Sequence, residues 1–481
     1  MKTKSLKSNF IFQTAYKIIV VIVPLLIAPY LTRRLGGEPL GIYSFTNSIA
    51  YYFVLLAGLG IAKYGQRVIS YQRDDDLLLR KTFWSLYYDQ LFFSIISSTL
   101  YVFFIVFFAK DYSSFYWIQL VYVVSSLFDI TWLYYGLESF KSVVIKNCLV
   151  KILECTFIFI FVKSSSDLWV YTLIMSSSVF LGQAILLPRA IKEIKPIKIG
   201  IKDLTEHIKP LFLLFISVVA STLYTVFDKT LLGIFSIKEN VAYYEYACKF
   251  VNIPKQLLAV IGTVLFPRAC HAFAEKKFEL QERYLDLSIF LTCLFGFAFM
   301  FGVMAVGRKF AVIYFGEEFR ECGNAIVCLS PLIIIVMIGD VVRSEYLIPV
   351  GKDKTFVFSI VISAVVNIVL SVILIPYLGI YGAVIGTLTA EMIGTTIQVI
   401  VCLKFYSFRK MIANSLVFAL LGVSMFLIVY LIDINTNESI LWLLLEIFIG
   451  FVVYTSLSIG AIALLFKDKK NEFLKLFQRK A

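Results

Sequence analysis

Apolar segments, each long enough to cross a lipid bilayer, follow one another along almost the whole chain. About fourteen of them lie between Phe10 and Phe466, separated by short polar joints. Hydrophobic residues make up 60% of the 481 residues and charged residues only 16%, which leaves too little polar surface for a water-soluble protein of this length. Because backbone groups inside lipid must bond to one another, we expect an all-α integral membrane protein.

The positive charges are divided unevenly between the two sides of the membrane. When the joints are numbered alternately, one set holds about 32 Lys and Arg and the other about 8; the richer set includes Arg80, Lys192 and Lys276. This bias predicts that both termini face the cytoplasm. The net charge of +13 is spread over separate joints rather than gathered on one face, so nucleic acid is not an expected partner.

The most basic joint runs from Pro188 to Pro210 and alternates Ile with Lys. It is either a linker lying on the inner leaflet or only a determinant of topology. It also divides the first twelve segments into two sets of six in the same orientation, as in transporters built from two lobes. We therefore expect an N-terminal lobe with its linker over 1–210, a second lobe over 211–403, and two added helices with a basic tail over 404–481.

Several charged residues lie within the apolar segments, where each needs a partner, an aqueous cavity or a function. In the first half of the chain these are Lys17, about two turns into the first segment, and Lys63 at the inner end of the second. The seventh segment places Lys229 on one stripe with Ser217, Ser221 and Thr225, and Asp228 adjoins it.

The eighth segment is the most informative. Glu245, Lys249, Asn252 and Gln256 follow the rhythm of one helical face, with Lys255 beside it. Glu391 lies in a similar polar row of the twelfth segment, with Thr387, Thr395 and Gln398. Either these charges neutralise one another, as Glu245 and Lys249 could at i, i+4, or they line a wet interior. The ammonium groups suit a phosphate ligand, and Asp228, Glu245 and Glu391 are candidates for coupling to H⁺ or Na⁺.

Signatures of enzymes and cofactors are lacking in the sequence. The run Asp74 to Asp76 is interpreted as a helix cap rather than a cation site, and His207 and His271 have no metal-ligand spacing. There is no Gly-Lys-Ser/Thr loop for nucleotide phosphates. The longest outer joint, Gly307 to Gly323, carries Arg308, Lys309 and Arg320, which we assign mainly to solvated surface. We expect neither catalysis, a metal site nor a bound cofactor.

Four segments resemble the polysaccharide repeat-unit flippases of the multidrug/oligosaccharidyl-lipid/polysaccharide exporter superfamily. The resemblance extends in order over nearly the whole chain, and the segments that carry it are Pro29 to Gly36 with Gly41 to Ser44; Trp132 to Glu138; Asp228 and Lys229 through Tyr244 and Lys249; and Asn367 through Pro376, Gly379 and Tyr381 to Ala383.

The resemblance implies a fold of two six-helix lobes in a V with two further helices, in a bacterial cell membrane. It implies a flippase that moves undecaprenyl-pyrophosphate-linked oligosaccharides outward, working beside polysaccharide polymerases and glycosyltransferases. Cationic residues of helices 1, 2 and 8 line the cavity in that family, and Lys17, Lys63, Lys249 and Lys255 match them here. A peptidoglycan-precursor flippase and a multidrug or cation exporter of the same fold remain alternatives, as does a membrane-embedded polymerase or ligase.

Overall fold

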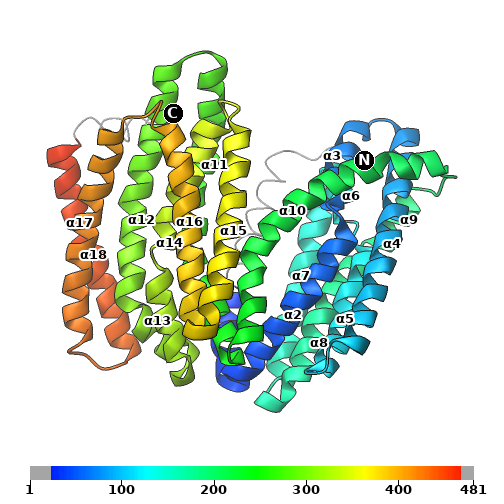
Figure 1. The fold of residues 1–481 in the computed structure, drawn as a ribbon, viewed down its shortest axis with the longest axis horizontal. Coiled ribbons are helices and arrows are strands. Elements are labelled where there is room, and N and C mark those ends of the chain that lie inside the picture. Colours follow the sequence, from blue (N-terminus) through cyan, green and yellow to red (C-terminus); the bar gives the residue numbers. More distant parts are fainter. Residues whose placement is uncertain (1–22, 467–481) are drawn as a thin grey trace. The chain divides into compact units, whose positions relative to one another are not determined.

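The computed structural model describes residues 23–466, apart from several side chains within 216–225 and 263–264. Every regular element in this range is helical (Figure 1). The chain forms two compact units, 1–242 and 243–481, and each is described by itself. The predicted lobe boundaries at 210 and 403 stay predictions.

The first unit begins with a helix over residues 23–35. Its further elements, in chain order, are α2 (Gly37–Gly58), α3 (Ile61–Gln72), α4 (Asp76–Phe107), α5 (Ser113–Val124), η1 (Ser125–Phe128), α6 (Thr131–Gly136), α7 (Phe140–Phe161), η2 (Ser165–Asp167), α8 (Leu168–Ala184), α9 (Leu187–Glu193) and α10 (Ile201–Phe235). Helix α11 (Lys238–Ala274) begins here and continues into the second unit.

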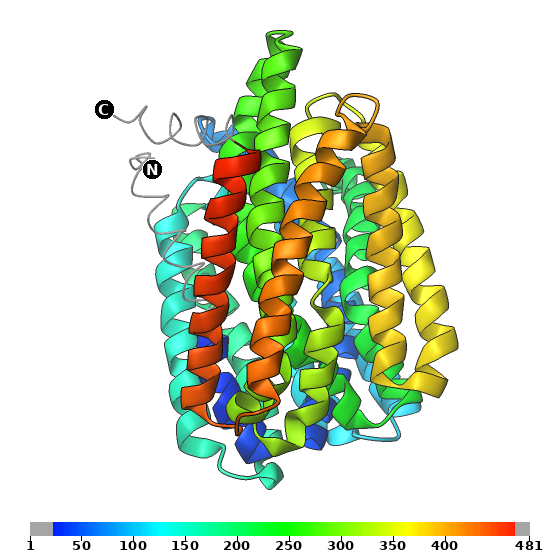
Figure 2. The ribbon, with the colours of Figure 1, turned by 90° about the vertical axis from the view of Figure 1, so that its left-hand side faces the viewer.

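The second unit continues with α12 (Phe278–Phe315), η3 (Glu317–Phe319), α13 (Arg320–Leu329), α14 (Leu332–Val342), η4 (Arg343–Leu347), α15 (Asp353–Leu378), α16 (Ile380–Cys402), α17 (Phe408–Asp433) and α18 (Ile440–Leu465). Helices α15 and α16, in yellow and yellow-orange, run side by side, and so do α17 and α18, in orange and red (Figure 2).

Among the described residues, ten helices are long and apolar enough to cross a membrane, or eleven when the bent pair 317–329 and 332–347 counts as one span. The fourteen crossings expected from the sequence are therefore not confirmed. The predicted span at 145–162 lies in α7, a continuous helix whose apolar sequence is interrupted by the charged residues Lys146, Lys151 and Glu154. The predicted span at 211–235 lies in α10, and several side chains within 216–225 of this helix are not among those that the structure describes.

The second predicted segment is two helices rather than one. The chain breaks between α2 and α3 at Leu59 and Gly60, whose φ angles are 40° and 77°. A Cβ at Gly60 would lie 3.1 Å from the Cβ of Leu214 in α10. Glycine at this position therefore allows both the positive φ angle and the close packing of the break against α10. Lys63 consequently lies in α3, beyond the break.

Close glycine contacts also explain two of the family-like segments in the first unit. A Cβ at Gly41 would lie 1.7 Å from the carbonyl oxygen of Lys238, and one at Gly233 would lie 1.9 Å from the ring of Phe45. Glycine at 41 therefore lets α2 approach the start of α11, and glycine at 233 lets the end of α10 approach the Phe45 ring of α2. In the Trp132 segment, the ring packs on Gly65, and its Nε1 donates to Gln90 Oε1 at 2.9 Å.

In the second unit, α15 and α16 pack along two matched stripes with a four-residue spacing. Helix α15 contributes polar residues and α16 small ones: Ser359, Ser363, Asn367 and Ser371 against Gly382, Gly386, Ala390 and Gly394, all buried. A Cβ at Gly394 would lie 2.2 Å from Ser363 Oγ, and the same hydroxyl donates to the Ala390 carbonyl at 2.9 Å. Without a hydrophobic effect between helices in lipid, such close packing and hydrogen bonding hold the pair together.

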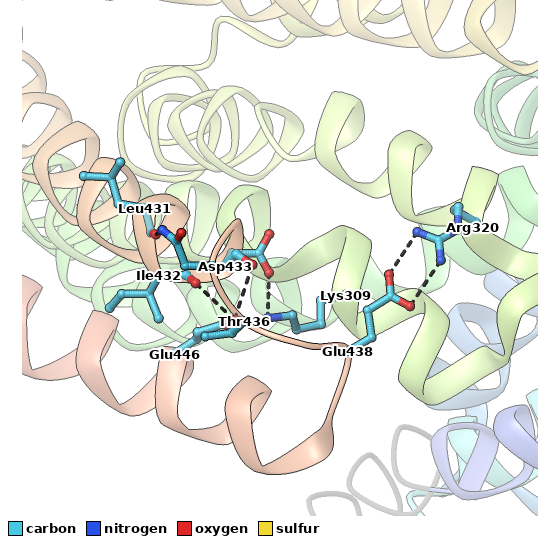
Figure 3. A network of polar contacts seen from close by, with 9 residues as sticks. Lys309, Arg320, Leu431, Ile432, Asp433, Thr436, Glu438 and Glu446 are labelled. Atoms are coloured by element: carbon cyan, nitrogen blue, oxygen red, sulfur yellow. Dashed lines mark hydrogen bonds and ion pairs between the residues drawn. The ribbon is translucent and has the colours of Figure 1, made fainter.

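A buried ion network joins α12 to the α17–α18 hairpin (Figure 3). The Nζ of Lys309 lies 2.9 Å from Asp433 Oδ1, 2.5 Å from Glu446 Oε1 and 2.8 Å from Thr436 Oγ1. The side chain of Lys309 is 4% exposed and that of Glu446 is 0% exposed. The prediction of solvated surface was therefore wrong for Lys309, because its carboxylate partners come from helices far along the chain. It holds for Arg320, whose guanidinium is half exposed and pairs with Glu438 at 2.9 Å.

Candidate functional site

The polar face of α11 in the second unit is the clearest candidate site. Within it, Glu245 and Lys249 form an ion pair at 2.5 Å, the carboxylate being 12% exposed and the ammonium 54%. The Lys249 Nζ also lies 4.8 Å from the centre of the Tyr246 ring. The two charges thus neutralise one another as the i, i+4 alternative proposed, yet the ammonium remains open on one side.

Further along the same helix, Asn252 and Gln256 are exposed and Lys255 is half-buried. Lys255 interacts electrostatically with Asp340 of α14 and Glu391 of α16, and Asp340 also forms an ion pair with Arg343 of η4. The structure therefore brings together predicted residues of two helices and adds Asp340 and Arg343, which the sequence analysis missed. Asp340 and Arg343 lie three residues apart in an apolar stretch of the sequence, and this spacing of opposite charges could have indicated an ion pair there.

The rest of the polar row on α16 has a structural role. Thr387 Oγ1 bonds with the Tyr244 hydroxyl of α11 at 2.8 Å, Thr395 Oγ1 donates to the Ile335 carbonyl at 3.1 Å, and Gln398 Nε2 donates to Ser359 Oγ at 2.9 Å. These side chains link neighbouring helices. The wet interior expected along this row stays a prediction, and Glu391 lies with the charged group around Lys255.

In the first unit, the predicted residues Asp228 and Lys229 lie in the C-terminal half of α10. Asp228 is 2% exposed and Lys229 is half-buried. The next residue, Thr230, bonds with the hydroxyls of Ser48 and Tyr52 of α2, each at 2.9 Å. Three hydroxyl groups thus meet between α2 and α10, and Asp228 interacts electrostatically with one of them, Tyr52.

The remaining predicted cationic residues are Lys63 and Lys17. Lys63 is exposed on α3. Lys17 lies outside the described residues, as do the side chains of Ser217, Ser221 and Thr225. The roles of Lys17, Lys63, Lys229, Lys249, Asn252 and Lys255 in substrate binding, and of Asp228, Glu245 and Glu391 in ion coupling, stay predictions.

The joints on the predicted cytoplasmic side carry caps and ion pairs. Asp75 caps α4 by accepting from the backbone N–H groups of Leu77 and Leu78, each at 3.0 Å, which confirms the interpretation of the acidic run. Between α11 and α12, the Lys277 ammonium bonds to Glu275 at 2.7 Å and lowers the pKa of that carboxyl. The part of the chain that the structure describes contains no group of three His, Cys, Asp or Glu arranged for a metal.

Many spanning helices with charged, partly accessible side chains on faces such as that of α11 define a multi-pass membrane transporter. The chain belongs to the polysaccharide biosynthesis protein family, whose model matches residues 6–273. A second family model, described as lipid II flippase MurJ, matches residues 179–461.

Two relatives are provisionally named O-antigen transporters. The protein from Shigella dysenteriae is 28% identical over 60% of this chain and 72% of its own length. That from Escherichia coli strain K12 is 23% identical over 73% of this chain and 86% of its own length. The chain is therefore similar in sequence to bacterial proteins named as transporters over 60% to 73% of its length.

Solved structures with the same fold include the lipid II flippase MurJ in an inward closed conformation, with a TM-score of 0.78, 18% identity, and coverage of 95% of this chain and 100% of that one. An inward-facing multidrug resistance MATE family transporter of the MOP superfamily aligns with a TM-score of 0.55 and 14% identity, over 79% of this chain and 96% of its own. The expected MATE-like fold is thereby confirmed.

Proposed function

We propose that the protein is a flippase that moves undecaprenyl-pyrophosphate-linked oligosaccharide repeat units from the inner to the outer leaflet of a bacterial cell membrane. It does so by alternating access, with both termini in the cytoplasm, and serves capsule, O-antigen or exopolysaccharide synthesis. The family match and the relatives' names support a polysaccharide precursor as cargo. Polymerases and glycosyltransferases of the same pathway are the expected partners.

The observation that carries the proposal is the face of α11. Lys249, Asn252 and Gln256 are exposed on a helix that is apolar enough to span a membrane, and Lys255 is half-buried beside them. Such groups are too costly to leave in hydrocarbon. We infer that this face borders an aqueous path, where ammonium groups attract phosphate oxygens as mobile point charges with three donors each.

The energetics favour such a path. A glycan and a pyrophosphate crossing unaided lose water from many polar groups, at several kcal/mol for each group left unpaired in an alkane-like interior. Lysines facing the path compensate the phosphate charge, while the polyprenyl tail stays in lipid. An inside-negative potential adds about 2.3 kcal/mol per charge per 100 mV in favour of outward movement of an anion.

The arrangement around Lys255 also supports coupling to H⁺ or Na⁺. Two carboxylates, Asp340 and Glu391, share this part of the second unit with the ammonium of Lys255 and the guanidinium of Arg343. A proton or Na⁺ entering this group changes its net charge and therefore its attraction for a pyrophosphate. Glu245 offers a second carboxylate, already paired with Lys249.

A direct test is flipping of purified lipid-linked glycans by the protein in proteoliposomes. We expect Lys255→Ala and Lys249→Ala each to reduce the flipping rate at least tenfold, about 1.4 kcal/mol of lost interaction. Lys255→Arg should retain more activity than Lys255→Ala, because it keeps the charge. Lys354→Ala, which removes an exposed charge at the start of α15, is the control. Unchanged flipping in the variants of Lys17, Lys249 and Lys255 alike would remove the phosphate-binding assignment.

The rival function is a peptidoglycan-precursor flippase, which the match of the MurJ family model over residues 179–461 favours. The same proteoliposomes distinguish the two substrates when loaded either with lipid II or with an undecaprenyl-pyrophosphate oligosaccharide lacking the peptide. Preferential flipping of lipid II would establish the rival. Efflux of cationic dyes without movement of either lipid would instead indicate a multidrug or cation exporter.

A further inference from the structure

The connection between α8 and α10 sorts its side chains onto two opposite sides. Ile194 is buried and Ile197 is partly buried in the apolar cluster of the first unit, whereas Lys195 and Lys198 are exposed. Each isoleucine and each lysine of this group is three residues from the next one of its kind, and residues 195–200 are not helical. In an extended chain with three residues per turn, this spacing places residues of one kind on one side. Ile194 and Ile197 therefore enter the protein core, whereas Ile191 and Ile201 stay exposed.

This segment is held firmly in place. The indole Nε1 of Trp84 donates to the carbonyl oxygens of Ile194 and Lys195, each at 3.2 Å. Ala190 of α9 is fully buried. At the start of α10, Asp203 bonds to Lys81 at 2.8 Å, and this contact and the Gly200 N–H lower the pKa of the carboxyl. The exposed lysines thus project from an ordered backbone, which reduces the entropy lost when they bind a ligand.

The lysines of the segment also differ from the neighbouring basic residues in their partners. Nearby, Arg73, Arg80, Lys81 and Arg189 each pair with a carboxylate. Within the described residues, four exposed ammonium groups of the segment have neither an ion pair nor a hydrogen bond, those of Lys192, Lys195, Lys198 and Lys202. These four ammonium groups are therefore available for a ligand.

Exposed apolar side chains next to these lysines indicate what binds there. Ile191 is 39% exposed and Ile201 is 81% exposed. The segment begins in α9, at the end of the candidate span Ser165–Glu193, and continues beyond it. Cations beside exposed apolar side chains at the edge of a bilayer suit a lipid interface, whereas a nucleic acid backbone offers phosphates for the lysines and nothing apolar for the isoleucines.

We propose that Lys192, Lys195, Lys198 and Lys202 form a binding surface for the headgroups of anionic phospholipids, with Ile191 and Ile201 entering the interface of the same leaflet. Ammonium groups near an anionic membrane surface are attracted to it, so the set gives selectivity for negatively charged over zwitterionic lipid. The surface rests on the predicted cytoplasmic orientation of this joint and is independent of the substrate that is flipped.

Native mass spectrometry of the purified full chain tests the surface directly. The probes are phosphatidylglycerol and phosphatidylcholine with identical acyl chains. We expect the variant K192Q/K195Q/K198Q/K202Q to bind phosphatidylglycerol about tenfold more weakly and phosphatidylcholine unchanged. A matched control removes four exposed charges elsewhere on the predicted cytoplasmic side, K276Q/K354Q/K404Q/R409Q. An equal loss in the control would overturn the proposal, because binding would then follow net charge alone.

Hydrogen exchange in nanodiscs provides a second readout that also identifies other occupants. We expect residues 190–203 to exchange more slowly in phosphatidylglycerol than in phosphatidylcholine, and this difference to disappear in the lysine variant. Protection that appears only in native membranes and not in phosphatidylglycerol nanodiscs would show a protein partner and contradict the proposal. Displacement of phosphatidylglycerol by equimolar undecaprenyl phosphate would assign the surface to the transported lipid instead.

Discussion

The buried network around Lys309 predicts a large, strongly coupled effect on stability. Replacement of Lys309 by Met removes an ammonium that is 4% exposed and leaves Glu446, 0% exposed, with Thr436 as its remaining partner. Removing one member of a buried ion pair costs about 3–5 kcal/mol, because the other charge stays buried without compensation. We therefore expect Lys309→Met to lower the free energy of unfolding by this amount and to loosen the α17–α18 hairpin first.

A double-mutant cycle separates the charge effect from lost packing. Glu446→Gln keeps an acceptor for Lys309, which also retains Asp433 at 2.9 Å, so we expect a cost of about 1–2 kcal/mol. In the double variant the buried carboxylate is gone, and the combined cost should fall below the sum of the single costs by about 1–3 kcal/mol. Equilibrium unfolding in mixed detergent micelles, followed by circular dichroism, measures each value.

Arg320 supplies the matched control. It joins the same α17–α18 connection through Glu438 at 2.9 Å, but its side chain is 52% exposed and that of Glu438 is 40% exposed. Exposed pairs contribute about 0–1 kcal/mol, so Arg320→Gln should change stability little. A cost for Lys309→Met no larger than that for Arg320→Gln, or strict additivity in the cycle, would refute the role given to burial.

Two further predictions concern packing and capping. Gly394→Ala should destabilise the second unit, because its Cβ would lie 2.2 Å from Ser363 Oγ; Ser363→Ala should restore part of the loss, and Gly460→Ala, where nothing lies within 4 Å, is the control in the same thermal unfolding assay. Asp75→Ala should cost about 1 kcal/mol through loss of the α4 cap, measured as faster hydrogen exchange in the first turn of α4. Asp74→Ala, which removes no cap bond, should leave that exchange unchanged.

The sequence predicted most reliably where partners lie within one turn of each other. The pairing of Glu245 with Lys249 and the cap at Asp75 follow from spacing alone, since helical geometry fixes which residues meet. Lys309 was assigned wrongly for the opposite reason. Glu446 lies 137 residues further along the chain, so only the tertiary fold shows that the lysine is enclosed rather than solvated.

Polar stripes in apolar helices show the same limit from another side. On α16, Thr387 and Gln398 bond to other helices, while Glu391 stays with the charged group at Lys255. The residue spacing placed all of them on one row, but it could not show which side chains bond to another helix and which face water. The hydrogen bonds in the structure, together with the chemistry of each side chain, make this distinction. A hydroxyl, or the Nε2 of Gln398, can bond directly to a neighbouring helix, whereas a charge within the membrane needs a counter-charge, water or a ligand. The charged members of each stripe, rather than its polar length, are therefore the positions at which transport should be tested.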